Sequence, residues 1–265
     1  MNDMLRRFGC VMAVVLLVIT AGCASMPASD GGELQTASDQ TDAQKRAAIR
    51  LQLAVGYYEQ RQPKVALDEI KQALAIYSDY AEAYGMRALI YMELGETRLA
   101  EENFTRALGL APKNPDLSNN YGWFLCQNDQ ESKAMQYFEA AFSSRSYQSP
   151  SKALNNAGLC SLKQKDRKAA ERYFARAFQF DPSNPVTNAN LAKIFYDRQD
   201  YERAHFYIGR VIQSEIWAAD VLWLAIKIEH KRGNSEAERS HAMQLRSRHP
   251  GSPEYAAYQR GAFDE

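Results

Sequence analysis

The sequence predicts an all-α fold, a solenoid of six helix-turn-helix units that stack along the chain. Two observations support this fold class. Small residues recur at a fixed step, and each stretch of helical periodicity ends at a polar turn or a proline. Between residues 116 and 146, two helical patterns flank the polar turn 128–130, with Gly122 in the first and Ala134 and Ala141 on one face of the second. Because small residues let two antiparallel helices approach closely, this segment is predicted to be a helical hairpin.

The same hairpin recurs with a period of 34 residues. Backward steps lead from Gly122, Ala134 and Ala141 to Ala88, Ala100 and Ala107, and then to Ala54, Ala66 and Ala73. Forward steps, after a two-residue insertion near Ser149 and Pro150, lead to Gly158, Ala170 and Ala177, then to Ala192, Ala204 and Val211, and last to Ile226, Glu238 and Leu245. The last set is degenerate, as expected for a terminal unit.

This period, with small residues at the eighth, twentieth and twenty-seventh positions, resembles the tetratricopeptide repeat (TPR) over about residues 47–252. The resemblance implies a right-handed superhelix whose first helices line a concave groove. The predicted units are 47–80, 81–114, 115–148, 151–184, 185–218 and 219–252. Residues 253–265 are expected to form a C-terminal capping helix and tail, because the last unit of a solenoid needs a cover.

Composition and motifs favour a protein-binding scaffold. The chain has 32 basic and 32 acidic residues, so its formal charge of zero gives no reason to expect nucleic acid as a partner. The four histidines lack metal-ligand spacing, and no phosphate-binding loop or nucleophile motif is present. We therefore expect no enzyme activity, no cofactor, no metal and no small-molecule substrate.

The N-terminal sequence is typical of a lipoprotein signal peptide. Arg6 and Arg7 precede an apolar run, residues 11–19, that is too short to span a bilayer comfortably, so residues 1–22 are predicted to be a signal peptide. Residues 19–23 (ITAGC) resemble the lipobox of bacterial lipoproteins, which implies cleavage before Cys23 and acylation of that residue. The alternative is an ordinary signal peptide with a chance cysteine.

The residues after Cys23 bear on location. Ala24 and Ser25 stand where an aspartate would retain a lipoprotein at the inner membrane, which favours an anchor on the periplasmic face of the outer membrane. Several acyl chains give stable anchoring. Residues 23–44 are predicted to be the lipidated cysteine and a flexible tether, because this stretch is rich in small polar residues and poor in large apolar ones.

The predicted groove is apolar at its N-terminal end. By the TPR resemblance, the second, fifth, sixth, ninth, twelfth and thirteenth positions of each unit face inward. In the first three units these positions include large apolar side chains, namely Leu51, Val55, Tyr58, Leu89, Met92 and Trp123. Such a patch is typical of a protein-binding surface that takes an amphipathic helix. The alternative is that these side chains pack against the N-terminal segment or neighbouring units.

Asparagines occupy the sixth position in three successive units, as Asn120, Asn156 and Asn190. Their amides could form a ladder that hydrogen-bonds the backbone of an extended peptide. They could equally be solvated groove residues.

Two cysteines remain after Cys10 and Cys23. Cys126 and Cys160 lie in the first helices of units three and four. In an oxidising periplasm they could form a disulfide that clamps the two units. The alternative is two small, buried, reduced side chains.

The lipobox, the tether and the six units together resemble the type IV pilus biogenesis and stability lipoprotein family, known as PilF or PilW. The resemblance is carried by residues 106–116 (RALGLAPKNPD), 119–126 (NNYGWFLC), 154–160 (LNNAGLC) and 244–255 (QLRSRHPGSPEY). It implies a pilotin, which would bind the pilus secretin subunit, travel with it to the outer membrane through the lipoprotein-sorting machinery, and promote its multimerisation. The alternative is a general periplasmic TPR scaffold in cell-envelope assembly.

Overall fold

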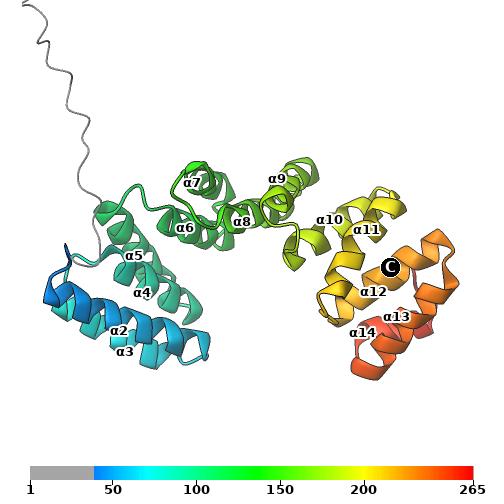
Figure 1. Ribbon diagram of the computed structural model, residues 1–265, viewed down its shortest axis with the longest axis horizontal. Helices are drawn as coiled ribbons and strands as arrows, with labels where there is room; N and C mark the ends of the chain where they lie inside the picture. Colours follow the sequence, from blue (N-terminus) through cyan, green and yellow to red (C-terminus); the bar gives the residue numbers. More distant parts are fainter. Residues whose placement is uncertain (1–38, 265) are drawn as a thin grey trace, which may run out of the picture. The chain divides into compact units, whose positions relative to one another are not determined.

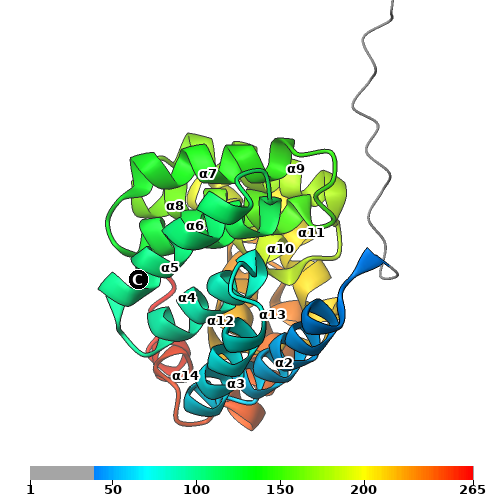
Figure 2. The same ribbon diagram turned by 90° about the vertical axis from the view of Figure 1, so that its left-hand side faces the viewer.

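The computed structural model describes residues 39–264, and within this range the chain forms helices and turns but no strand. In chain order the helices are α2 (Asp42–Glu59), α3 (Pro63–Ile76), α4 (Ala81–Glu93), α5 (Thr97–Leu110), α6 (Pro115–Gln127), α7 (Glu131–Ser143), α8 (Pro150–Lys163), α9 (Arg167–Phe180), α10 (Pro185–Asp197), α11 (Tyr201–Gln213), α12 (Ala219–Arg232), α13 (Ser235–Arg248) and α14 (Pro253–Gln259). Consecutive helices pack as pairs along the chain (Figures 1 and 2). The predicted TPR solenoid of helical hairpins is confirmed.

The small residues lie where the two helices of each pair meet. The alanines at the three recurring positions are all fully buried, namely Ala54, Ala66, Ala73, Ala88, Ala100, Ala107, Ala134, Ala141, Ala170, Ala177, Ala192 and Ala204. At two units the first of these positions is a glycine with no room for a Cβ atom. A Cβ on Gly122 would stand 2.9 Å from the ring of Phe138, and one on Gly158 would stand 2.7 Å from that of Phe174. The close approach of the helices therefore explains the period.

The turn inside each hairpin has a constant conformation. The fifteenth residue of every unit has a positive φ, at Arg61, Gly95, Asp129, Lys165, Gln199 and Gly233. This left-handed conformation ends the first helix and reverses the chain. Only two units use glycine there, although glycine adopts the conformation without steric cost.

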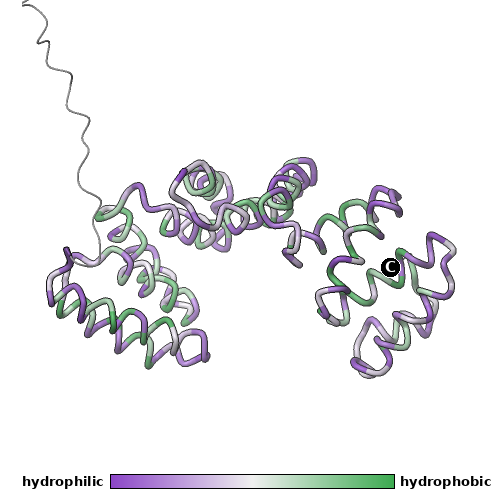
Figure 3. Tube along the Cα trace, viewed as in Figure 1, coloured by the Kyte–Doolittle hydropathy of each residue, from purple (hydrophilic) through white to green (hydrophobic). Residues whose placement is uncertain are grey.

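Large apolar side chains of the second helices fill the space beside the small residues. Ile70, Phe104, Phe138, Phe174 and Ile208 are all buried. Along the helices hydrophobic residues alternate with hydrophilic ones, as a half-buried helix requires (Figure 3). The core thus passes from unit to unit, as stacking repeats demand.

The two-residue insertion between units three and four is anchored by an aromatic side chain. Tyr147 lies in the connection between α7 and α8 and is buried against Ala141 and Ala153. Burial raises the pKa of its hydroxyl, with a smaller contribution from Asp116. The connection is therefore fixed in place just before α8 begins at Pro150.

Helix α14 covers the last hairpin. Its Tyr255 and Tyr258 pack against a cluster formed by Leu222, Trp223 and Ile226 of α12 and by residues of α13. The chain then continues over α12 to Asp264.

The N-terminal predictions fall mostly outside the described residues. The signal peptide (1–22), Cys23 and most of the tether lie there. The tether was predicted to extend to residue 44, but α2 already begins at Asp42. An acidic residue in the first turn stabilises a helix through its dipole, which favours this earlier start. Within residues 39–264, none of the helices is both long and apolar enough to cross a membrane.

Candidate functional site

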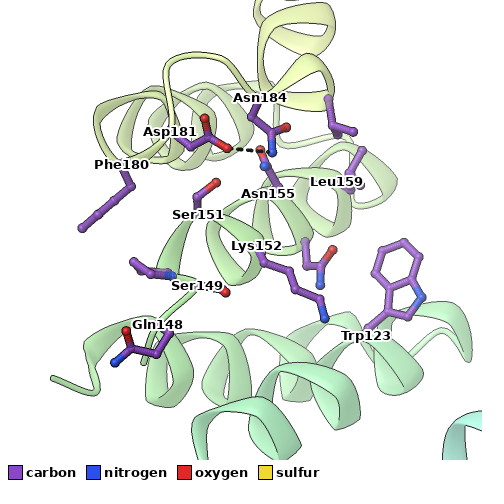
Figure 4. A pocket seen from close by; sticks show the side chains of 13 residues that line it. Trp123, Gln148, Ser149, Ser151, Lys152, Asn155, Leu159, Phe180, Asp181 and Asn184 are labelled. Atoms are coloured by element: carbon purple, nitrogen blue, oxygen red, sulfur yellow. Dashed lines mark hydrogen bonds between the residues drawn. The ribbon is translucent and has the colours of Figure 1, made fainter. Parts of the chain in front are cut away.

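A cleft with a volume of about 690 Å³ lies on the inner face of α8. We call it the central cleft. Its floor is the inner face of α8, and Trp123 of α6 stands at one side. The connection 148–149 and the segment from Phe180 to Val186 complete its walls. Figure 4 shows Trp123 and Phe180 on opposite sides.

The walls of the central cleft carry exposed apolar side chains. Phe180 is 58% exposed and Val186 is 45% exposed, whereas Leu159 and Trp123 are partly buried. Large apolar side chains that remain accessible inside a concavity are typical of a binding site. The cleft therefore offers apolar contacts to a ligand without rearrangement of the core.

Hydrogen-bonded amides connect three units beside the central cleft. Thr187 Oγ1 donates to Asn155 Oδ1 at 2.7 Å, which links α10 to α8. Asn156 Nδ2 donates to Asn119 Oδ1 at 2.9 Å, and Asn119 Nδ2 donates to Asn120 Oδ1 at 3.2 Å, which links α8 to α6. Asn119 and Thr187 are fully buried. A satisfied buried network of this kind fixes the relative position of its helices.

Both charge signs occur in the walls of the cleft. Lys152 extends from α8, and Asp181 lies in the turn between α9 and α10. Hydrogen bonds from Ser183, helped by one from Asn184, hold the pKa of Asp181 below its ordinary value. The lysine and this carboxylate would orient a ligand rather than select its net charge.

The predicted groove residues divide into two groups. Trp123 and Asn156 line the central cleft. Leu51, Tyr58 and Leu89 are partly buried against the core of the first units, and Leu89 and Met92 pack against that of the next. Val55 is 37% exposed. Packing between units thus covers much of the predicted N-terminal apolar patch, while the accessible apolar surface extends into unit four.

The asparagines of the sixth position do not form a uniform ladder. Asn120 and Asn156 both hydrogen-bond to the buried Asn119, whereas Asn190 Nδ2 donates to the backbone carbonyl of Val186 in its own helix, at 2.8 Å. The buried partners Asn119 and Asn155 stand one residue earlier, at the fifth position. Periodicity identifies this face but not which amides bond to each other.

A disulfide joins Cys126 of α6 to Cys160 of α8, with Cα atoms 5.9 Å apart. An ion pair lies beside it. Lys163 Nζ donates to the backbone carbonyl of Cys126 and to Asp129 Oδ1, both at 2.7 Å, and lies 3.4 Å from Glu131. The hydrogen bond with Asp129 raises the pKa of Lys163. Units three and four are therefore held together covalently and electrostatically.

The two most exposed apolar residues of the central cleft were not predicted. Phe180 ends α9 and Val186 is the second residue of α10, on either side of the turn Asp181–Asn184. Val186 occupies the second position of unit five, an inward position, so the repeat pattern could have found it. Phe180 has no repeat position that marks it. Among residues 39–264, no three His, Cys, Asp or Glu side chains gather as a metal ion would require.

Residues 81–114 and 151–184 match the family model described as the tetratricopeptide repeat. The chain is 27% identical over 248 residues to the type IV pilus assembly protein PilF of Pseudomonas aeruginosa, covering 94% of this chain and 96% of PilF. The solved structure of Pseudomonas aeruginosa PilF aligns with a TM-score of 0.77 and 26% identity, covering 83% of this chain and all of that one.

A second solved structure gives the firmest assignment. It is PilW, described as a widely conserved type IV pilus biogenesis factor, and it aligns with a TM-score of 0.71 and 31% identity. The alignment covers 80% of this chain and 98% of PilW. Since fold, repeat and sequence agree over nearly the whole of PilW, the chain belongs to the family of type IV pilus biogenesis TPR proteins that includes PilF and PilW.

Proposed function

We propose that this protein is a pilotin, which binds the secretin subunit of the type IV pilus in the periplasm and promotes its localisation and multimerisation in the outer membrane. The observation that carries the proposal is the central cleft, where Phe180 and Val186 remain exposed on the inner face of a TPR solenoid. TPR solenoids act as protein-binding scaffolds, and the family works in pilus biogenesis.

The central cleft suits a peptide segment of a protein partner. Its volume of about 690 Å³ has room for several side chains. Trp123, Leu159, Phe180 and Val186 offer apolar contacts, and the amide of Asn156 can pair with a peptide backbone. An amphipathic segment of the secretin subunit would fit this combination of contacts.

In this proposal, the acylated Cys23 anchors the protein to its membrane. Acyl chains would hold the protein at the periplasmic face of the outer membrane, and the lipoprotein-sorting machinery would carry protein and client together. Binding and transport are then separate properties of the chain, so each can be removed alone.

The binding step is tested with the double variant Phe180→Glu/Val186→Glu. Two carboxylates in the apolar wall should weaken binding of the purified secretin subunit at least tenfold, measured by calorimetry, because apolar contact is replaced by charge that must be desolvated. Met243→Glu is the matched control, since Met243 is 65% exposed and lies in α13, outside the cleft. Unchanged affinity of the double variant, with an unchanged circular dichroism melt, would remove the central cleft from the proposal.

The extent of the surface toward the N-terminus is tested with Val55→Glu. Val55 is the exposed member of the predicted apolar patch, so its substitution should leave the core intact. Leu51→Glu would place a charge against the core of the first units and would therefore confuse binding with stability. Weaker secretin binding by Val55→Glu would extend the binding surface to the first unit.

The transport step is tested with Cys23→Ala. Without the acyl chains the protein should appear in the soluble periplasmic fraction, and the secretin should remain in the inner membrane. Normal levels of secretin multimers in the outer membrane of this variant would contradict the transport role. Capture of cell-envelope enzymes instead of secretin by the wild-type protein would favour a general scaffold.

A further inference from the structure

The C-terminal tail of the chain lies folded against the inner face of α12. After α14 the chain reverses at Gly261, which has a positive φ of 69°. The ring of Phe263 then stacks on the imidazole of His230, with the ring centres 3.8 Å apart and the planes 2° from parallel. The ring of Trp223 also stacks on that of Phe263, with the ring centres 5.6 Å apart. Tyr258 meets the ring of Phe263 edge-on, with the ring centres 6.1 Å apart. Phe263 thus sits in an aromatic socket.

Polar contacts hold the residues on both sides of that ring. Tyr196 of α10 donates its hydroxyl to the backbone carbonyl of Phe263 at 3.3 Å, and Lys231 Nζ lies 2.6 Å from Asp264 Oδ1. The ion pair lowers the pKa of Asp264, and the hydrogen bond from Lys231 is the largest cause. Units five and six therefore recognise three features of the tail: an aromatic ring, a backbone carbonyl and a carboxylate.

The residues that hold the tail occupy groove positions of the repeat. Trp223 and Lys231 stand in unit six where Asn155 and Lys163 stand in unit four, at the fifth and thirteenth positions. Tyr196 and His230 both occupy the twelfth position of their units. The tail therefore lies on the face that forms the central cleft two units earlier, where a solenoid binds its ligands.

An open cleft of about 380 Å³ adjoins the tail. Trp223 contacts the tail and also lines this open cleft, together with Asn190, Lys193 and Lys227. Lys227 Nζ lies 5.4 Å from the ring centre of Trp223 and 5.5 Å from that of Tyr196. Burial, and then the neighbouring Lys193, lower the pKa of Lys227, because both disfavour its charged form, and a carboxylate placed here would stabilise that charge. Asp220 and Glu254 line the same cleft, so its walls carry both charge signs and offer polar contacts beyond those that the tail uses.

We propose that the inner face of units five and six is a second peptide-binding site, for a segment of another protein in which an aromatic residue is followed by an acidic one, and that the C-terminal tail occupies it in cis. The tail is exchangeable because it is short and its charged contact is exposed to solvent. The Asp264 side chain is 87% exposed, and such a pair contributes little. A tethered ligand competes through its high effective concentration, so a partner with further contacts in the open cleft displaces it. This proposal does not depend on the secretin function.

The test removes the cis ligand and supplies it in trans. The probe is a synthetic peptide with the sequence of residues 260–265 (RGAFDE), titrated into the whole chain carrying Phe263→Ala. The readout is the nuclear magnetic resonance shift of the Trp223 indole N–H, with the indole of Trp123 as internal reference. We expect the peptide to bind the variant at least tenfold more tightly than the intact chain, because the intact site is already filled.

Specificity controls separate recognition from packing. A peptide with alanine in place of the phenylalanine should not shift Trp223, and Lys231→Glu added to the Phe263→Ala chain should weaken binding by about two- to fivefold, as the loss of an exposed ion pair allows. Lys168→Glu, an exposed change in α9, should not. If Phe263→Ala unfolds the chain, Phe263→Leu replaces it, because leucine keeps apolar packing but lacks the ring that stacks on His230. Equal affinity for intact and variant chains, or no binding to a folded variant, would show that the tail is only a cap.

Discussion

The backbone of Gly122 lies against the ring of Phe138, so closely that a Cβ atom on Gly122 would stand 2.9 Å from two of its ring carbons and 3.2 Å from the carbonyl oxygen of Ala134. Phe138 is fully buried and cannot move aside. The same relationship recurs one unit later between Gly158 and Phe174. In units three and four the hairpin is therefore built on a contact that a single methyl group disrupts.

Gly122→Ala should destabilise the protein despite alanine's better helix propensity. Overpacking costs about 1–3 kcal/mol, while alanine gains about 1 kcal/mol over glycine inside a helix, so we expect a net loss of up to about 2 kcal/mol. Gly209→Ala is the matched control, because it lies inside α11 with no atom within 4 Å of the added Cβ. Urea unfolding should show opposite signs for the two variants. A stabilised Gly122→Ala protein would mean that the helices are further apart than described.

In the turns, by contrast, a substitution by glycine should stabilise the protein. Gln199 holds a φ of 62° at the fifteenth position of unit five, where unit two has Gly95. A left-handed conformation costs a residue with a Cβ about 1–2 kcal/mol, partly offset by the greater freedom of glycine in the unfolded chain. Gln199→Gly should therefore raise the free energy of unfolding by about 0.5–1 kcal/mol. Gly95→Ala should lower it, and similar stabilities for both variants and wild type would contradict a strained turn.

The repeat pattern predicted the fold because its signal is local. A small residue at the eighth position and an aromatic one in the second helix are enough to specify a hairpin such as the one around Gly122 and Phe138. The central cleft could not be predicted from the repeat period. Its wall depends on a connection fixed by Tyr147, and its apolar surface includes Phe180, which ends the second helix of unit four.

The accessibility and hydrogen bonds of the inner-face residues could not be predicted from the repeat period either. Spacing placed Leu51 and Leu89 in the groove, but how far each remains accessible depends on the packing of neighbouring units. The hydrogen bond from Asn156 to Asn119 likewise depends on the distance between two helices and on side-chain conformations. Such tertiary features follow from the assembled units, not from the pattern of one.

The disulfide should contribute strongly to stability. Cys126 and Cys160 are separated by 34 residues, and closing a loop of that length in the unfolded chain is worth about 3–4 kcal/mol. The double variant Cys126→Ala/Cys160→Ala should lose about this much in urea unfolding. Wild-type protein unfolded in the presence of a thiol reductant should match the double variant, and reductant should leave the double variant itself unchanged. Equal stability of oxidised wild type and double variant would contradict this.

Acid sensitivity should arise in part from His241. Burial is the largest cause that lowers the pKa of this residue below its ordinary value near 6.5, with Glu229 opposing the effect and His205 adding to it. Above that pH the imidazole is neutral in both folded and unfolded chains, so it contributes nothing to the pH dependence. As pH falls below 6.5 the unfolded chain binds the proton more readily, and the free energy of unfolding must fall until the pH passes the folded-state pKa. Between pH 7 and pH 5 the wild type should therefore lose more stability than His241→Gln. Urea unfolding at both pH values measures this, and parallel losses in the two proteins would show that His241 titrates alike in both states.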